Sequence, residues 1–282
     1  KYSVKIILRH MVDRLRYGRG TRLVMGNALV SRLLLSLTER KVSILTQTTL
    51  ESLLRDERGV NGVVLTQGGE RRTLTVRGGV VLASGGFNRH GAKRAQMLPG
   101  ASVTWCPAAP GHTGAALDLA LGVGARFGAS SLDAPAERAA QPVLSHAFWA
   151  PVSMRKRVDG TTAVFPHFIM DRGKPGMITL NQNGERFLNE STSYHLFGLA
   201  MQAANASSAC IPAWLVCDAA ALKRYGLGMI RPGAEPGKSI APYLADGYLT
   251  QAANIPELAI KLSVDAAVLA RTIATFNAAA EQ

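Results

Sequence analysis

The sequence predicts an α/β region followed by an α+β region. Its 282 residues exceed what one domain core usually serves, so two domains are expected. A helical pattern followed directly by a short apolar run opens the first region, which is the order found in wound sheets. After residue 130, extended runs, aromatic-rich loops and helical patterns mix without that order. A hydrophobic fraction of 47% with 18% charged residues is typical of a globular enzyme.

The first region divides into a helix, a strand and a meander. Apolar residues share one face from about 26 to 40, which predicts a helix, and the run 42–46 predicts the strand after it. Residues 60–66 and 73–76 alternate apolar with polar side chains on either side of a turn at 67–69. This alternation predicts antiparallel strands with one solvated face.

A second apolar run, 79–83, ends in Ser84, Gly85 and Gly86. Its continuous apolar character predicts a strand buried on both faces of a parallel sheet. Glycines at the carboxyl end of such a strand let the backbone approach a ligand closely, and ligands of open α/β sheets bind at that edge. A simple turn is the alternative interpretation of the Gly-Gly pair.

A Pro-rich and Gly-rich stretch, 99–111, marks a boundary or hinge, and the run GHTGAA at 111–116 follows it. This run predicts the start of a helix that ends near Gly122, with Thr113 as its cap. The small residues leave backbone N–H groups and the positive end of the helix dipole open to an oxygen-bearing ligand. Tight packing is the alternative interpretation.

The segment ITLNQNGERFLNESTSY at 178–194 carries the densest group of polar side chains. Its Asn-Gly step lies between two apolar stretches and predicts a β-hairpin. The second arm of that hairpin presents Arg186, Asn189, Glu190 and Tyr194, which suits a substrate or cofactor site; a salt-bridged surface hairpin is the alternative. Three further helices are expected, at 196–204, 256–262 and 263–280.

Several residues near this segment are expected to have structural roles. Arg172 and Lys174 in DRGKPG are expected to frame a turn, and Arg186 and Glu190 to brace the hairpin. His167 is interpreted as a packing or surface histidine. The aromatic residues of the second region are core residues by default, although they could also wall an apolar cavity.

The charge and the cysteines exclude several classes of function. A net charge of +13 favours an anionic partner, yet the basic stretch 1–22 lacks the aromatic pattern of nucleic-acid readers, so we expect no nucleic acid there and a solvated basic face. The three cysteines form no C-x-x-C pair, which indicates neither a disulfide framework nor a metal site. No apolar run is long enough for a membrane span and none resembles a signal peptide, so a reducing, cytoplasmic location is expected.

Three motifs together resemble the flavoprotein superfamily of fumarate reductases and 3-ketosteroid dehydrogenases. They are GVVLASGGF at 79–87, PGHTGAALDLALGVGA at 110–125 and LNQNGERFLNESTSY at 180–194, and the stretch 255–277 resembles a helical segment of the family's capping domain. The resemblance implies FAD as cofactor, a partial Rossmann-like FAD-binding domain with an antiparallel meander at 1–110, and an α+β capping domain at 111–282.

The resemblance also implies that parts of the family's architecture lie outside this sequence. The strand with its G-x-G-x-x-G turn, which would hold the pyrophosphate, does not occur here, and neither does the family's carboxyl-terminal Gly-rich segment. The chain is therefore expected to be an internal fragment of a longer protein, truncated at both ends. By itself it is expected to bind FAD poorly and to be inactive.

The resemblance assigns roles to individual residues. Tyr194 stands where fumarate reductases carry a proton-donating Arg, and the Thr-Gly-Ala-Ala at 113–116 replaces their Asp-Gly, so both departures favour the ketosteroid dehydrogenases. Tyr194 is the expected catalytic base. The implied cofactor-binding residues are Leu50, Ala83, Ser84, Gly85, Gly86, Thr113, Gly114 and Ala115. The implied substrate-binding residues are Trp149, Phe165, Asn189 and His195, and Phe168 is a further candidate wall residue.

The implied reaction is the dehydrogenation of a carbon-carbon bond next to a ketone, with a steroid or another cyclic ketone as the small-molecule substrate. The resemblance leaves the electron acceptor open. Two alternatives remain: a fumarate-reductase-like or succinate-dehydrogenase-like flavoprotein acting on a dicarboxylate, and a non-catalytic flavin-binding or scaffold protein.

Overall fold

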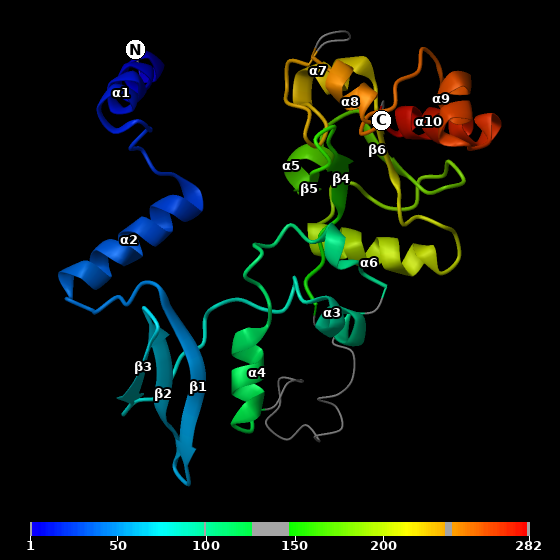
Figure 1. Ribbon diagram of the computed structural model, residues 1–282. Coiled ribbons are helices and arrows are strands. Elements are labelled where there is room, and N and C mark those ends of the chain that lie inside the picture. Colours follow the sequence, from blue (N-terminus) through cyan, green and yellow to red (C-terminus); the bar gives the residue numbers. More distant parts are fainter. Residues whose placement is uncertain (1, 99, 126–146, 235–238, 281–282) are drawn as a thin grey trace. The chain divides into compact units, whose positions relative to one another are not determined.

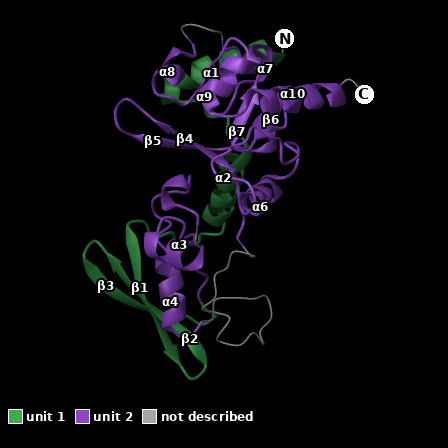
Figure 2. Ribbon diagram, turned by 90° about the vertical axis from the view of Figure 1, so that its right-hand side faces the viewer, with its two compact units in different colours: residues 1–79 green, residues 80–282 purple. Residues whose placement is uncertain are grey.

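The chain forms two compact units, Lys1–Gly79 and Val80–Gln282, in a computed structural model that describes residues 2–98, 100–125, 147–234 and 239–280 (Figures 1 and 2). The division falls at 79/80, whereas the domain boundary predicted from the sequence lies at 110/111 and stays a prediction.

The first unit contains two helices and one antiparallel sheet. Helices α1 (Tyr2–Tyr17) and α2 (Met25–Glu39) precede strands β1 (Thr48–Asp56), β2 (Gly59–Gln67) and β3 (Glu70–Thr75), which pair in the order β1-β2-β3. The predicted helix and meander are confirmed, and β1 extends the meander by one strand. Val63 and Val64 of the central strand are buried, while β3 is exposed throughout.

The predicted strand at 42–46 is wrong. Lys41 turns the chain with a positive φ of 53°, and the N–H of Val42 donates to the carbonyl of Leu37, so these bonds finish α2. None of the strand pairs includes residues 42–46. An apolar run becomes a strand only where a neighbour offers its backbone, and within the described residues no neighbour does so here.

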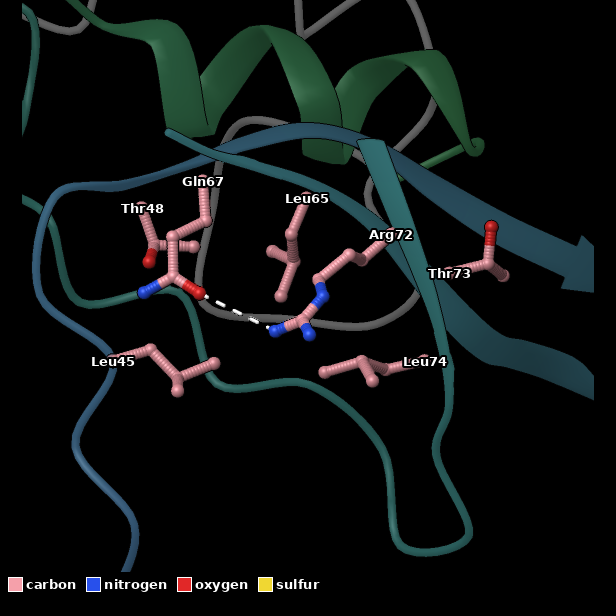
Figure 3. Close-up of a pocket in the computed structure, with 7 residues that line it drawn as sticks. All are labelled: Leu45, Thr48, Leu65, Gln67, Arg72, Thr73 and Leu74. Carbon is pink, nitrogen blue, oxygen red and sulfur yellow. Dashed lines mark hydrogen bonds between the residues drawn. The ribbon is translucent and has the colours of Figure 1, made fainter. Parts of the chain in front are cut away.

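A hollow of about 500 Å³ opens beside the sheet of the first unit (Figure 3). Its polar lining includes Arg72, whose Nη1 donates to Oε1 of Gln67 at 3.4 Å. The lining residues are Leu45, Thr48, Leu65, Gln67, Arg72, Thr73 and Leu74. None of the predicted site residues is among them.

The second unit begins with short elements joined by long loops. They are α3 (Gly91–Met97), the 3-10 turn η1 (Val103–Trp105) and α4 (Ala115–Gly122), followed by the antiparallel pair β4 (Val152–Lys156) and β5 (Thr162–Pro166). The predicted buried strand at 79–83 does not form: Val81 is 92% exposed and the run pairs with no described strand. Every strand pair among the described residues is antiparallel.

Most of the remaining elements contribute to two apolar clusters among the described residues of the second unit. The bounds of the remaining elements are α5 (Ile169–Arg172), β6 (Met177–Leu180), α6 (Tyr194–Asn205), β7 (Trp214–Cys217), α7 (Ala219–Tyr225), α8 (Ala241–Ala245), α9 (Ile255–Leu262) and α10 (Ala266–Ala280). Leu180 of β6, Ala259 of α9 and Leu269 of α10 are each 0% exposed and pack together with Ile178. The three helices predicted at 196–204, 256–262 and 263–280 are confirmed with small shifts of their ends.

The predicted hairpin at 178–194 forms only its turn. Strand β6 pairs with β7, and the return segment touches β6 through a single bridge between Leu180 and Arg186. The side chain of Asn181 accepts from the N–H groups of Asn183 and Glu185, which closes the turn. The N–H of Thr179 donates to the Glu190 carboxylate at 2.7 Å, so a side chain stands where a partner strand's carbonyl would be.

Within the described parts of the chain, no helix combines the length and the apolarity needed to cross a membrane.

The basic face expected at the amino terminus lies on α1 and the loop after it, where most side chains are exposed. Asp13 is the exception: it accepts from the hydroxyl and the N–H of Thr21, and these bonds lower the pKa of its carboxyl.

The cluster around Leu180 predicts a sharp contrast between two aliphatic truncations. Leu180→Ala removes a fully buried side chain, and we expect it to lower the free energy of unfolding by about 2–5 kcal/mol. Ile260→Ala on α9, where the side chain is 78% exposed, is the matched control and is expected to change it by less than about 0.5 kcal/mol. Denaturant unfolding measures both; equal losses would contradict the core assignment.

Candidate functional site

The two glycine motifs predicted to hold a cofactor lie side by side in the second unit. The N–H of Gly114 donates to the carbonyl of Gly86 at 3.1 Å, and the N–H of Arg89 donates to the carbonyl of His112 at 2.9 Å. These two bonds join the loop after residue 83 to the loop that leads into α4. The sequence separates the motifs by about 28 positions, yet the backbone brings them into direct contact.

Glycine is required at the two positions where the loops approach each other. Gly85 has a φ of +94°, and a Cβ placed there would lie 2.9 Å from Nε2 of His112. Gly114 has a φ of +80°, and its Cβ would lie 2.9 Å from the Cβ of Phe87 and from the stem of Lys93. Both a left-handed backbone and the lack of space therefore exclude a side chain.

The exposed backbone of these loops fits an extended, oxygen-rich ligand such as FAD. Ser84, Gly85 and Gly86 are exposed, and α4 begins at Gly114 with no side-chain cap on its first N–H groups. Nδ1 of His112 is buried without a hydrogen-bond partner in the structure. Uncapped N–H groups at a helix start are common partners of anionic ligands.

Two of the predicted cofactor residues occupy other positions than expected. Thr113 does not cap α4, because Gly114 is the N-cap and the N–H of Thr113 donates to the carbonyl of Gly111. Leu50 lies on β1 of the first unit, opposite Leu65, so its role stays a prediction. Ala83 and Ala115 are exposed next to the glycine contact.

Tyr194 is the first residue of α6 and lies among aromatic rings. Its ring meets the edges of Phe148 and Phe168, with centroids 5.4 Å and 5.3 Å away. Phe148 in turn stacks on the imidazole of His195 at 4.6 Å. Among the described residues, none forms a hydrogen bond to the Tyr194 hydroxyl.

His195 ties the segment before β4 to α6. The N–H of Trp149 donates to Nδ1 of His195 at 3.2 Å, which places the proton of a neutral imidazole on Nε2. Trp149 also packs against α6, since a Cβ placed on Gly198 would lie 2.7 Å from the Cβ of Trp149. The predicted substrate residues Trp149 and His195 are therefore neighbours of Tyr194.

The other two predicted substrate residues lie elsewhere in the second unit. Phe165 on β5 packs edge-on against the ring of His167, with centroids 5.1 Å apart. Asn189 is exposed, and its side chain accepts from the N–H of Ser191. The structure instead brings Phe148 and Phe168 to Tyr194. The only sequence signal for Phe148 was its place directly before Trp149.

Two exposed aromatic side chains contact the ring of Tyr194. Phe148 is 73% exposed and Phe168 is 45% exposed. We call Phe148 and Phe168 the apolar wall. Such a group of exposed large apolar side chains commonly marks a binding surface.

Glu190 fixes the irregular segment that leads to Tyr194. Its carboxylate accepts from the N–H of Thr179 and from Nε and Nη2 of Arg186, the latter at 2.6 Å. The hydrogen bonds between Arg186 and Glu190 raise the pKa of the Arg186 guanidinium. The predicted pairing of Arg186 with Glu190 is confirmed, although it braces a loop and not a strand.

His167 and Arg172 are both buried: His167 agrees with the packing alternative, and Arg172, which was expected to frame a turn, is the last residue of α5. Nδ1 of His167 contacts Oδ2 of Asp171 at 2.5 Å, and Nε2 contacts Oγ of Ser153 at 2.7 Å. Arg172 is 1% exposed. Within the described ranges, no group of three or more His, Cys, Asp and Glu side chains gathers as a metal site would require.

Comparison with known proteins decides the family. The model of a family described as "FAD binding domain" matches residues 7–282. The chain belongs to this FAD binding domain family. FAD is the family's cofactor.

Several relatives of this FAD-binding chain are dehydrogenases of ring ketones. A 4-oxocyclohex-2-ene-1-carboxylate 5-dehydrogenase from Sinomonas cyclohexanicum is 32% identical over 99% of the chain and 45% of the relative. A 3-oxosteroid 1-dehydrogenase from Mycolicibacterium smegmatis is 30% identical over 90% of the chain and 42% of the relative. The chain thus spans less than half the length of the curated relatives it matches.

A solved structure shares the fold. The 3-ketosteroid delta1-dehydrogenase from Sterolibacterium denitrificans, in complex with 1,4-androstadiene-3,17-dione, matches with a TM-score of 0.75 and 31% identity, over 96% of this chain and 46% of that one. The mixed helices and small antiparallel sheets described above are therefore those of a flavoprotein fold.

The contact between the two glycine loops predicts a specific loss of FAD binding. Gly114→Ala places a Cβ against Phe87 in a left-handed backbone, a conformation that costs an L-residue about 1–2 kcal/mol. We expect the affinity of the whole protein for FAD to fall about tenfold, since about 1.4 kcal/mol corresponds to that factor. Titration of the apoprotein with FAD, followed by flavin fluorescence, measures the change.

Gly111→Ala is the matched control for this substitution. Gly111 lies in the same loop, and a Cβ there would meet nothing within 4 Å. Its FAD affinity is expected to stay that of the parent protein. If both variants bind FAD as the parent does, the glycine contact is not part of the cofactor site.

Proposed function

We propose that the whole protein is an FAD-dependent dehydrogenase that introduces a carbon-carbon double bond next to the ketone of a cyclic, apolar substrate. The observation that carries this proposal is the position of Tyr194. Its hydroxyl is free of hydrogen bonds from the described residues, and its ring lies between Phe148 and Phe168. An acid-base group is thus presented within an apolar surface, as the chemistry of an apolar ketone requires.

The residues of this chain would divide the reaction between them. The phenolate form of Tyr194 would accept the proton from the carbon next to the ketone and become the hydroxyl, while the neighbouring carbon gives up a hydride and the double bond forms between the two carbons. FAD, when bound, supplies the acceptor for that hydride. The residues that would hold it are the predicted set Leu50, Ala83, Ser84, Gly85, Gly86, Thr113, Gly114 and Ala115, of which the glycine contact is the best supported by geometry.

The apolar wall supports a substrate with a large apolar ring system. Phe148 and Phe168 present uncharged rings to Tyr194, whereas a dicarboxylate substrate would need cationic partners there. His195 adds one polar donor, because Nε2 carries the proton when Nδ1 accepts from Trp149. The names of the two curated relatives share a ring ketone, which agrees with this substrate class.

The domain assignment follows the same proposal. Residues 1–110 would belong to a partial Rossmann-like FAD-binding domain and residues 111–282 to a capping domain that closes over the substrate. The antiparallel meander of the first unit and the small sheets of the second agree with these assignments. The parallel sheet of the Rossmann-like part would need strands that the described residues do not include.

The proposed base predicts the behaviour of Tyr194→Phe. Removing the hydroxyl takes away the proton acceptor, and general acid-base groups contribute about 10²–10⁴-fold to rates. We expect anaerobic flavin reduction by a 3-ketosteroid to slow by a factor in that range, with FAD content and substrate binding retained. Stopped-flow absorbance of the flavin measures the rate.

Tyr225→Phe is the matched control, since Tyr225 closes α7 and contacts Lys174 and Arg224. It is expected to reduce its flavin at the parent rate. A Tyr194→Phe protein with full rate would remove Tyr194 from the base role. Bleaching of the flavin by succinate in place of the ketone would favour the dicarboxylate reading.

A further inference from the structure

We propose that Arg172 is the residue that positions Tyr194, by binding the backbone of the segment just before α6. This inference rests on the proposed function, because it concerns the placement of the proposed base. It assigns to Arg172 a role in the geometry of the reaction without contact with the substrate.

Among the described residues of the second unit, Arg172 is the most completely enclosed charged residue. The side chain is 1% exposed and is among the largest fully buried side chains. Nε donates to the carbonyl of His167 at 3.4 Å, Nη1 donates to the carbonyl of Glu190, and Nη2 donates to the carbonyl of Thr192 at 2.6 Å. Its flat face lies over the ring of Phe197, 4.4 Å from the centroid.

A buried charge that bonds to backbone carbonyls is costly to keep, and this cost points to a specific task. Burial lowers the pKa of the Arg172 guanidinium, while the charges of Asp171 and Glu190 act in the opposite direction. An apolar residue of similar volume would fill the space at less cost, since desolvating an ion is unfavourable. What an apolar residue cannot do is hold two carbonyls of an irregular loop at fixed positions.

The positions of those carbonyls explain the connection with Tyr194. Thr192 is two residues before Tyr194, and Ser193 between them caps α6 by accepting from the N–H of Leu196 at 3.3 Å. Phe197, under the guanidinium, lies in the same first turn of α6. Arg172 therefore contacts the chain two residues before Tyr194 and three residues after it.

The other end of α5 holds the ring of Tyr194. Phe168 is the N-cap residue of α5 and meets the Tyr194 ring edge-on, with centroids 5.3 Å apart. A helix of four residues is not stable by itself. His167 anchors it: its imidazole bonds Asp171 within the helix and Ser153 on β4, and Ser153 bonds the hydroxyl of Tyr248 at 2.7 Å.

The test combines substitutions of Arg172 with the Tyr194→Phe background in the whole protein. Arg172→Met keeps much of the volume but removes every donor, and Arg172→Lys keeps the charge but not the planar fork. We expect each to slow anaerobic flavin reduction by a 3-ketosteroid at least tenfold, with FAD content and the substrate dissociation constant close to those of the parent. In the Tyr194→Phe background, neither substitution should slow the reaction further.

A second measurement tests, without using catalysis, whether Arg172 holds the backbone just before α6. Hydrogen exchange, followed by mass spectrometry, should become at least tenfold faster for amides in 191–197 of both Arg172 variants and stay unchanged in β6 and β7. Arg224→Met is the matched control, since Arg224 also lies over an aromatic ring, Tyr225, at 5.3 Å but is exposed. It should alter neither the exchange nor the rate.

The two readouts separate this inference from the proposed function. Unchanged exchange at 191–197, or an equal loss of rate with and without the Tyr194 hydroxyl, would overturn the role of Arg172. Faster exchange together with a fully active Tyr194→Phe protein would support the binding of this backbone by Arg172 and would reject Tyr194 as the base. If Arg172→Met does not fold, Arg172→Lys carries the same test.

Discussion

Apart from the single bridge between Arg186 and Leu180, the backbone of residues 181–193 pairs with no strand among the described residues, and this constraint shapes the second unit. Buried N–H and C=O groups must be paired, so side chains replace the missing strand. Asn181 satisfies the N–H groups of the turn, Glu190 satisfies Thr179, and Arg172 satisfies the carbonyls of Glu190 and Thr192. An irregular segment held by side chains can place the start of α6 at a position that no hairpin register would allow.

The replacement of a partner strand by side chains also explains which elements could not be predicted from the sequence. The helices α2, α6, α9 and α10 and the meander follow from local patterns of apolar residues and turns, so they were predictable. The apolar runs 42–46 and 79–83 looked the same as strands, but a strand needs a partner from another part of the chain. For β6 that partner is β7, with Ile178 opposite Val216, and nothing near residue 178 indicates it.

The residues of the candidate site also fall into two groups, those that a contiguous motif predicts and those that only the fold brings together. The glycines at 85, 86 and 114 and the pair Tyr194 and His195 belong to contiguous motifs, which the resemblance to a flavoprotein superfamily identifies. Only the fold brings Phe148 to Tyr194 and Arg172 to Thr192 and Phe197, and an Arg followed by Gly, Lys, Pro and Gly has the composition of a surface turn. Burial of an arginine is uncommon enough that no local pattern would predict it.

The two halves of the site depend on opposite properties of the backbone. At Gly85 and Gly114 the backbone has positive φ angles and no space for a Cβ, so the proposed cofactor site requires glycine at both positions. Around Tyr194 the backbone is held by buried side chains, so the chemical side depends on their donors and rings. Damage to the first should therefore lower flavin affinity, whereas damage to the second should leave the flavin bound and lower the rate. Because the two halves lie on different loops of the second unit, these effects should be separable and nearly additive.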